Sequence, residues 1–217
     1  MKLSLSPCNL TDYLTKQLAC FYPDKNEVHN ALSLIMPRCM ERLTTCFSSI
    51  HKKYYYESDE AFFNHLHADH YAMFLYIVAN EAYLQHIQPL AEKAFLLNKA
   101  LHGIDAFYAI SLPEIFLFVH PIGTVLGNAH YKNYFVVYQN VTVGSDLQGV
   151  YPSFGYASVL YSKSSVIGEC LFGDNVCVGA HSFVRNKQIP DNSIVVGNYP
   201  HDIVKFNKRN NRQDFFS

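Results

Sequence analysis

Histidines are the residues of this sequence best suited to acid–base chemistry, and 11 of the 217 residues are histidine. A neutral imidazole titrates near working pH, so it can take a proton from an attacking hydroxyl group. Three histidines in the glycine-containing second half, His120, His130 and His181, are candidates for such a base. The alternative for His120 is a purely structural histidine at the start of a strand. His181 also suits a groove-lining or surface position, and His130 suits an acceptor-binding one.

A second group of histidines has the pattern H-x-H-x-x-H, at His65, His67 and His70. Zinc ligands on one helix favour positions i and i+4. His67 and His70 are three residues apart, and His65 falls on another helix face. We therefore expect no metal site from this group.

The elements that position the second-half histidines follow a period of six. Residues at this spacing are apolar: Phe154, Leu160, Val166, Phe172, Val178 and Val184. Small or β-branched residues stand four positions after each of the first five: Ser158, Ser164, Cys170, Val176 and Ser182. This period is neither the 3.6 of a helix nor the 2 of a flat strand, and it indicates a parallel β-helix of hexapeptide repeats. Three short strands would form each coil, with an apolar column inside. Ordinary strands with chance spacing are the alternative.

The first half has helical patterns instead. We expect a helix before Pro23, and a second that Asp24 or Asn26 caps and Pro37 kinks or divides. A long helix should run from Ser58 to His86, and a last one should end at Gly103. The fold class is therefore α+β, with a helical domain over residues 1–110 and a β-helix over 111–206. Residues 207–217 form a polar tail, which we expect to be mobile.

Composition excludes several classes of protein. The net charge is −1, with no basic run before residues 205–212, which argues against general nucleic-acid binding. The six cysteines form no C-x-x-C pair and suggest reduced core thiols in a cytosolic protein. Neither a signal peptide nor a segment of eighteen apolar residues is found. We therefore expect a cytoplasmic protein with no membrane span.

Residues 104–203 resemble the serine acetyltransferases, especially the serine-acetyltransferase-like members among polysaccharide-modification enzymes. Residues 120–127, HPIGTVLG, are similar to that family's H-A-T-G-I-V-V-G segment, and residues 138–144, YQNVTVG, to L-Q-S-V-T-L-G. Residues 178–184, VGAHSFV, resemble the coil I-G-A-G-S-V-V, and residues 197–200, GNYP, resemble the terminal G-V-P.

This resemblance implies a left-handed β-helix, acetyl-CoA as cosubstrate without a metal, and homotrimers or dimers of trimers with active sites between subunits. It implies that His120 is the catalytic base and that Asp105, fifteen residues upstream, orients it. The same matching places Ser162, Gly179 and Ala180 at the coenzyme A groove. Tyr151, in the loop that carries the family's acceptor triplet, and His130, counted as one coil beyond His120, are the candidates for binding the acceptor.

Two departures from the family concern the acceptor. Val119 stands where the family has an aspartate, and residues 150–152, VYP, replace its R-H-P triplet. A zwitterionic serine needs charged partners in a pocket, so these changes favour a hydroxyl of a sugar or surface polysaccharide. The alternatives are a serine O-acetyltransferase of cysteine biosynthesis, a non-catalytic scaffold, and a carbonic-anhydrase-like trimer with a three-histidine zinc site.

Overall fold

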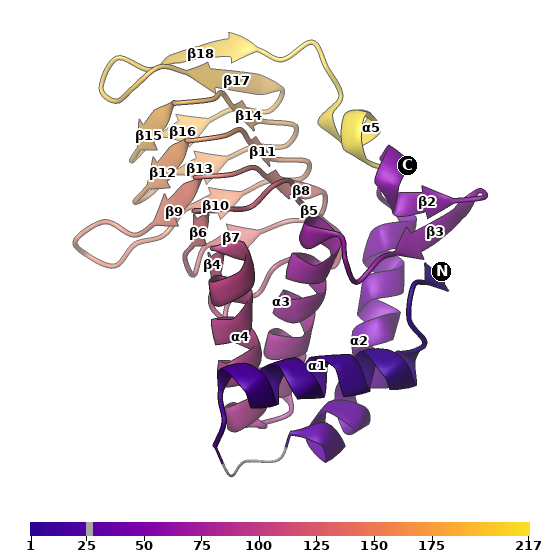
Figure 1. The fold of residues 1–217 in the computed structure, drawn as a ribbon. Helices are drawn as coiled ribbons and strands as arrows, with labels where there is room; N and C mark the ends of the chain where they lie inside the picture. Colours follow the sequence, from indigo (N-terminus) through magenta and orange to yellow (C-terminus); the bar gives the residue numbers. More distant parts are fainter. Residues whose placement is uncertain (25–27) are drawn as a thin grey trace.

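The computed structural model describes residues 1–24 and 28–217. Helices make up most of its first half, and its second half is a stack of short strands that rises from one end of those helices (Figure 1). The long helices are α1 (Pro7–Phe21), α2 (His29–Ser48), α3 (Ala68–Leu84) and α4 (Gln88–His102). No helix within the described ranges is long and apolar enough to cross a membrane.

Local sequence sets the ends of α1 and α4. Ser6 caps α1, because its hydroxyl accepts the Asn9 N–H, and Pro7 occupies the first turn. The end of α4 is at Gly103, as predicted, and the φ of this residue is +63°, a conformation that glycine adopts without strain.

The start of α2 differs from the prediction. Its N-cap is Val28, with no side-chain cap, so the predicted Asp24 cap is wrong, and the other candidate, Asn26, lies outside the described residues. Pro37 lies inside α2 without dividing it.

The long helix predicted from Ser58 to His86 begins only at Ala68, so the prediction is wrong for residues 58–67. A short 3₁₀ helix (Lys53–Tyr55) is followed by a hairpin of β2 (Tyr56–Glu57) and β3 (Glu60–Phe63). Ser58 and Asp59 form its turn, with φ of +52° and +60°. The N-terminal strand β1 (Lys2–Leu3) pairs in parallel with β3. That pairing joins segments far apart in sequence, which local periodicity does not reveal.

Helix α3 is the core helix of the first half. Fourteen of its 17 residues are buried, and it packs between α2 and α4. The Tyr76 hydroxyl donates to the carbonyl of Ile110 and accepts the N–H of Leu112, at 2.9 Å in both cases. These bonds fix the segment that leads from the helices into the strands.

The cysteines are all free thiols. Four are buried, as predicted, whereas Cys8 and Cys20 are exposed. Burial raises the pKa of Cys39 and of Cys46 to about 12, so neither thiol forms a nucleophilic thiolate at neutral pH.

The second half consists of three parallel sheets, one for each side of the coil. The six-stranded sheet contains β5 (Phe116–Phe118), β8 (Phe135–Val137), β11 (Val159–Leu160), β14 (Cys177–Val178), β17 (Ser193–Val196) and the antiparallel β18 (Ile203–Phe206). The five-stranded sheet contains β4 (Asp105–Ala106), β6 (Val125–Leu126), β9 (Thr142–Gly144), β12 (Ser165–Ile167) and β15 (Phe183–Arg185). The four-stranded sheet contains β7 (His130–Tyr131), β10 (Ser153–Phe154), β13 (Leu171–Phe172) and β16 (Gln188–Ile189).

Strand register confirms the hexapeptide period. The pairs Leu160↔Val178 and Val166↔Val184 are each 18 residues apart, so one coil contains three repeats of six. Every apolar position of the predicted repeat is at most 8% exposed, and every small position is at most 2% exposed. The predicted fold class, helices followed by a parallel β-helix, is confirmed.

The C-terminal segment is ordered, so the expected mobile tail is a wrong prediction. Helix α5 (Asn211–Phe215) lies beside the six-stranded sheet (Figure 1), where the Asn211 side chain bonds Cys177 Sγ at 3.1 Å. Phe215 and Phe216 are buried, and Phe216 pairs with Ile50 of the helical half. The segment is ordered because the outward face of this sheet is apolar at Leu117, Val136 and Val159, and these residues are buried.

The coil begins earlier than the domain division at residues 110 and 111. Strand β4 already pairs with β6 in the five-stranded sheet, through Asp105↔Val125. The three-part division into residues 1–110, 111–206 and 207–217 remains a prediction.

Acidification should destabilise this fold through His70. Burial, and then the neighbouring His67, lower the pKa of His70 to about 3. An unfolded histidine titrates near pH 6.5. The unfolded state therefore binds more protons as pH falls below about 6.5, and stability decreases. Between pH 7 and pH 5 we expect His70 alone to lower the free energy of unfolding by about 2 kcal/mol, and His102, whose pKa burial lowers to about 4, to add a similar loss.

Chemical denaturation at several pH values measures this effect. The variant His70→Gln should lose about half of the slope, because an amide does not titrate and can still accept the Asn64 N–H, whereas His102, whose pKa burial lowers to about 4, still contributes a similar amount. His86, which is exposed, gives the matched control His86→Gln, whose slope should equal that of the native chain. An unchanged slope in His70→Gln would contradict the assignment.

Candidate active site

The site is built on one edge of the β-helix. Turns of successive coils that join the six-stranded to the five-stranded sheet stack in a column, which we name the His120 edge (residues 119–124, 138–141, 161–164 and 179–182). One non-glycine residue in each turn has positive φ: His120 (+48°), Asn140 (+56°), Lys163 (+61°) and His181 (+60°). Backbone hydrogen bonds of 2.8 to 3.0 Å join each turn to the one before.

The turn that carries His120 is longer than the others. Phe118 and Leu126 are eight residues apart, whereas their strand partners Val137 and Val143 are six apart. The two extra residues push the turn out of the coil, and the His120 side chain is 75% exposed. Its imidazole is therefore open to substrates.

Asp69 supplies a carboxylate to His120. Its Oδ1 accepts the backbone N–H of His120 at 3.1 Å, and its Oδ2 lies 3.7 Å from His120 Nδ1. Asp69 belongs to the first turn of α3, and its side chain is only 10% exposed. Sequence reasoning missed this residue, because it is 51 positions from His120. The feature of the sequence that could have identified Asp69 was a carboxylate at the start of a long apolar segment.

Asp105, the carboxylate predicted to orient His120, has a different neighbour. Its Oδ2 lies 2.5 Å from Lys99 Nζ, and its backbone N–H donates to the Thr124 carbonyl. The structure thus brings Asp69 to the imidazole and pairs Asp105 with a lysine of α4. The catalytic role of Asp105 remains a prediction.

The residues predicted at the coenzyme A groove share the edge with His120. Ser162 lies in the third turn of the column, and Gly179 and Ala180 lie in the fourth. Ala180 is exposed, and the other two are half-buried. A ligand extended along this edge could reach all three from His120.

His130 and Tyr151, the predicted acceptor residues, lie on a different edge. The His130 N–H donates to the Pro152 carbonyl at 3.1 Å. This bond places His130, and Tyr151 next to Pro152, where the five-stranded sheet meets the four-stranded sheet. The Tyr151 ring packs on Gly127, where an added Cβ would lie 2.6 Å from its Cε1 atom. The five-stranded sheet therefore separates them from His120 within one chain.

The H-x-H-x-x-H histidines do not converge as a group of three, because the rings of His67 and His70 stack at 4.1 Å between centroids whereas His65 has a different partner. His70 is buried against the rings of Phe47 and Tyr55, and His65 bonds the Ser4 hydroxyl. Within residues 1–24 and 28–217, no group of three or more histidine, cysteine, aspartate or glutamate side chains is placed to hold a metal ion.

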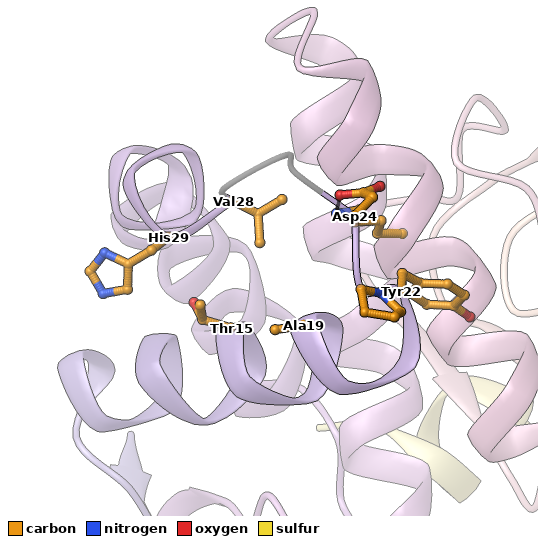
Figure 2. A pocket seen from close by; sticks show the side chains of 8 residues that line it. Thr15, Ala19, Tyr22, Asp24, Val28 and His29 are labelled. Carbon is orange, nitrogen blue, oxygen red and sulfur yellow. Dashed lines mark hydrogen bonds and ion pairs between the residues drawn. The ribbon is translucent and has the colours of Figure 1, made fainter.

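The helical half has a separate cavity of about 290 Å³ between α1, the start of α2 and α4 (Figure 2). Thr15, Ala19 and Tyr22 of the α1 side contribute to its lining, together with the ion pair of Asp24 and Lys93 at 2.6 Å. None of the predicted site residues lines it.

Comparison with known proteins identifies the relatives of this chain. No family model matches it. The serine acetyltransferase of Synechococcus elongatus is 27% identical over 130 residues, covering 58% of this chain and 53% of that protein. The serine acetyltransferase of Staphylococcus xylosus is 27% identical over 139 residues, covering 62% of this chain and 63% of that protein. The chain thus matches between half and two thirds of the length of these curated relatives.

Solved structures show the same fold. The Neisseria gonorrhoeae serine acetyltransferase superposes with a TM-score of 0.68 at 20% identity, covering 95% of this chain and 80% of that one. A serine acetyltransferase complex with CoA gives a TM-score of 0.66 at 14% identity, covering 82% and 76%. At these identities the structural likeness establishes the fold, and the sequence matches relate the chain to serine acetyltransferases.

Proposed function

We propose that this relative of the serine acetyltransferases is an acetyl-CoA-dependent O-acetyltransferase, with His120 as its general base. The observation that carries the proposal is the exposed imidazole of His120 with the carboxylate of Asp69 behind it. Similarity to serine acetyltransferases supports the reaction, and a related structure with CoA bound supports acetyl-CoA as the cosubstrate.

His120 would act on the acceptor hydroxyl. Its imidazole takes the hydroxyl proton as the oxygen attacks the thioester carbonyl. The carbon–sulfur bond then breaks, and the proton passes to the departing thiolate. Asp69 holds the ring in place and stabilises the imidazolium that forms. A backbone N–H of a glycine-bearing coil would stabilise the tetrahedral oxyanion.

Serine is the acceptor that these observations favour over a glycan. Val119 and residues 150–152 lack the charges expected for a zwitterion, and this absence suggested a sugar. Asp69, however, brings a buried carboxylate to the base from the helical half. A carboxylate there can attract the ammonium group of an amino acid, and the curated relatives are serine acetyltransferases.

A complete site would use more than one copy of this chain. His130 and Tyr151 lie across the five-stranded sheet from His120, so their predicted contact with the acceptor requires a neighbouring copy. This requirement fits the homotrimer that the resemblance implies.

Acceptor specificity tests the proposal. Purified protein with acetyl-CoA should acetylate L-serine with a kcat/KM at least tenfold above that for N-acetyl-L-serine, which keeps the hydroxyl but lacks the ammonium group. Monosaccharides should be poorer still. Release of CoA thiol measures the rate, and thiol release without acceptor is the control. Faster transfer to a sugar than to serine would show that the acceptor is a glycan, and no transfer to either would refute the proposal.

A further inference from the structure

We infer that Lys163 and His181 bind the phosphate groups of coenzyme A on the His120 edge. This inference rests on the proposed function, since it concerns the same cosubstrate. Nothing in the matched family segments assigns either side chain a role. The inference comes from the order of residues along the column of turns.

The turn in which a residue lies fixes its distance along the edge from His120. Adjacent parallel strands are about 4.8 Å apart, so each coil adds about that distance. Lys163 lies two coils beyond His120, and His181 lies three coils beyond. Their backbones are therefore about 10 and about 14 Å along the edge from His120.

The length of the coenzyme fits this spacing. About a dozen bonds separate the sulfur of coenzyme A from its first phosphorus, which corresponds to roughly 15 Å when the arm is extended. With the thioester at His120, an arm that follows the edge brings its diphosphate to the level of His181. The lysine side chain reaches several ångströms beyond its own coil, so the Lys163 ammonium covers the same level.

Both side chains are available to an anion. Lys163 and His181 are exposed. Among the described residues no acidic side chain pairs with Lys163, whereas Lys187 is bound to Asp202 at 2.5 Å. An ammonium group and an imidazole N–H are both donors that phosphate oxygens accept.

The test compares coenzyme A with pantetheine, which lacks the phosphates. In Lys163→Asn we expect the dissociation constant of coenzyme A to rise about tenfold, the effect of losing one charge-assisted hydrogen bond. The dissociation constant of pantetheine should change less than twofold. In His181→Asn the dissociation constant of coenzyme A should also rise. Asparagine tolerates positive φ, so both variants should fold, and thermal unfolding checks this.

Lys132 provides the matched control, because it is an exposed lysine on another edge, over the Tyr156 ring. Lys132→Asn removes the same charge and should leave the dissociation constant of coenzyme A unchanged. Calorimetry on the full chain measures all these values. Equal weakening of coenzyme A and pantetheine in Lys163→Asn, or no weakening, would overturn the inference. The proposed function fails separately, if the native chain binds neither compound.

Discussion

Replacing His120 with alanine is expected to lower kcat at least a hundredfold. General bases contribute about 10²- to 10⁴-fold to such reactions, and without the imidazole the hydroxyl would have to lose its proton to water. The side chain is 75% exposed, so its removal leaves no cavity and should not unfold the protein. Initial rates of thiol release with saturating acetyl-CoA and L-serine give the measurement.

Two further variants make the His120 result interpretable. His120→Asn removes the base but keeps a residue that tolerates the φ of +48°, so strain at alanine is excluded as the cause. His201→Ala removes an exposed histidine near the far end of the coil stack and should retain full activity. Near-native turnover in His120→Asn would remove His120 from the mechanism.

Asp69→Asn is expected to lower kcat by roughly ten- to a hundredfold. Asparagine keeps an oxygen that can accept the His120 N–H, but it removes the charge that stabilises the imidazolium. We expect less than the loss seen when a fully buried triad carboxylate is replaced, because His120 is exposed and its Nδ1 is 3.7 Å from the carboxylate. The KM for acetyl-CoA should stay unchanged, since the effect is on proton transfer.

A double-mutant cycle separates positioning from general structural support. If Asp69 acts on proton transfer through His120, then adding Asp69→Asn to His120→Asn should lower kcat no further, whereas loss of its attraction for the serine ammonium group would raise the KM for serine in either background. Asp105→Asn is the competing variant, because the family resemblance implies that Asp105 has the orienting role. A larger loss in Asp105→Asn than in Asp69→Asn would favour Asp105 and contradict the role of Asp69. An effect of Asp69→Asn on kcat that persists in the His120→Asn background would contradict a role through the base.

The β-helix was predictable because its core is local in sequence. Each coil places residues six positions apart on successive sides, so Leu160 and Val166 point into the same interior without distant partners. Paired residues such as Leu160 and Val178 are one coil apart. The period and the register therefore follow from the same short stretch, and both agree with the structure.

The errors occurred where distant segments meet. Residues 60–63 have an apolar pattern that suits a helix, but β1 of the N-terminus pairs with them and makes a strand. Phe215 and Phe216 lie in a polar segment, yet they pack on a sheet face and on Ile50. In each case burial against a remote surface outweighs the local pattern.

The sequence by itself determined the hexapeptide coil and the end of the last long helix at Gly103. Only the tertiary structure decided which carboxylate lies beside His120, and which candidate residues share its edge. The physical reason is that local periodicity fixes the position of a residue within its own coil or helix. The contact between His120 and Asp69 depends instead on how α3 docks against the first coil, and packing across the whole chain sets that arrangement.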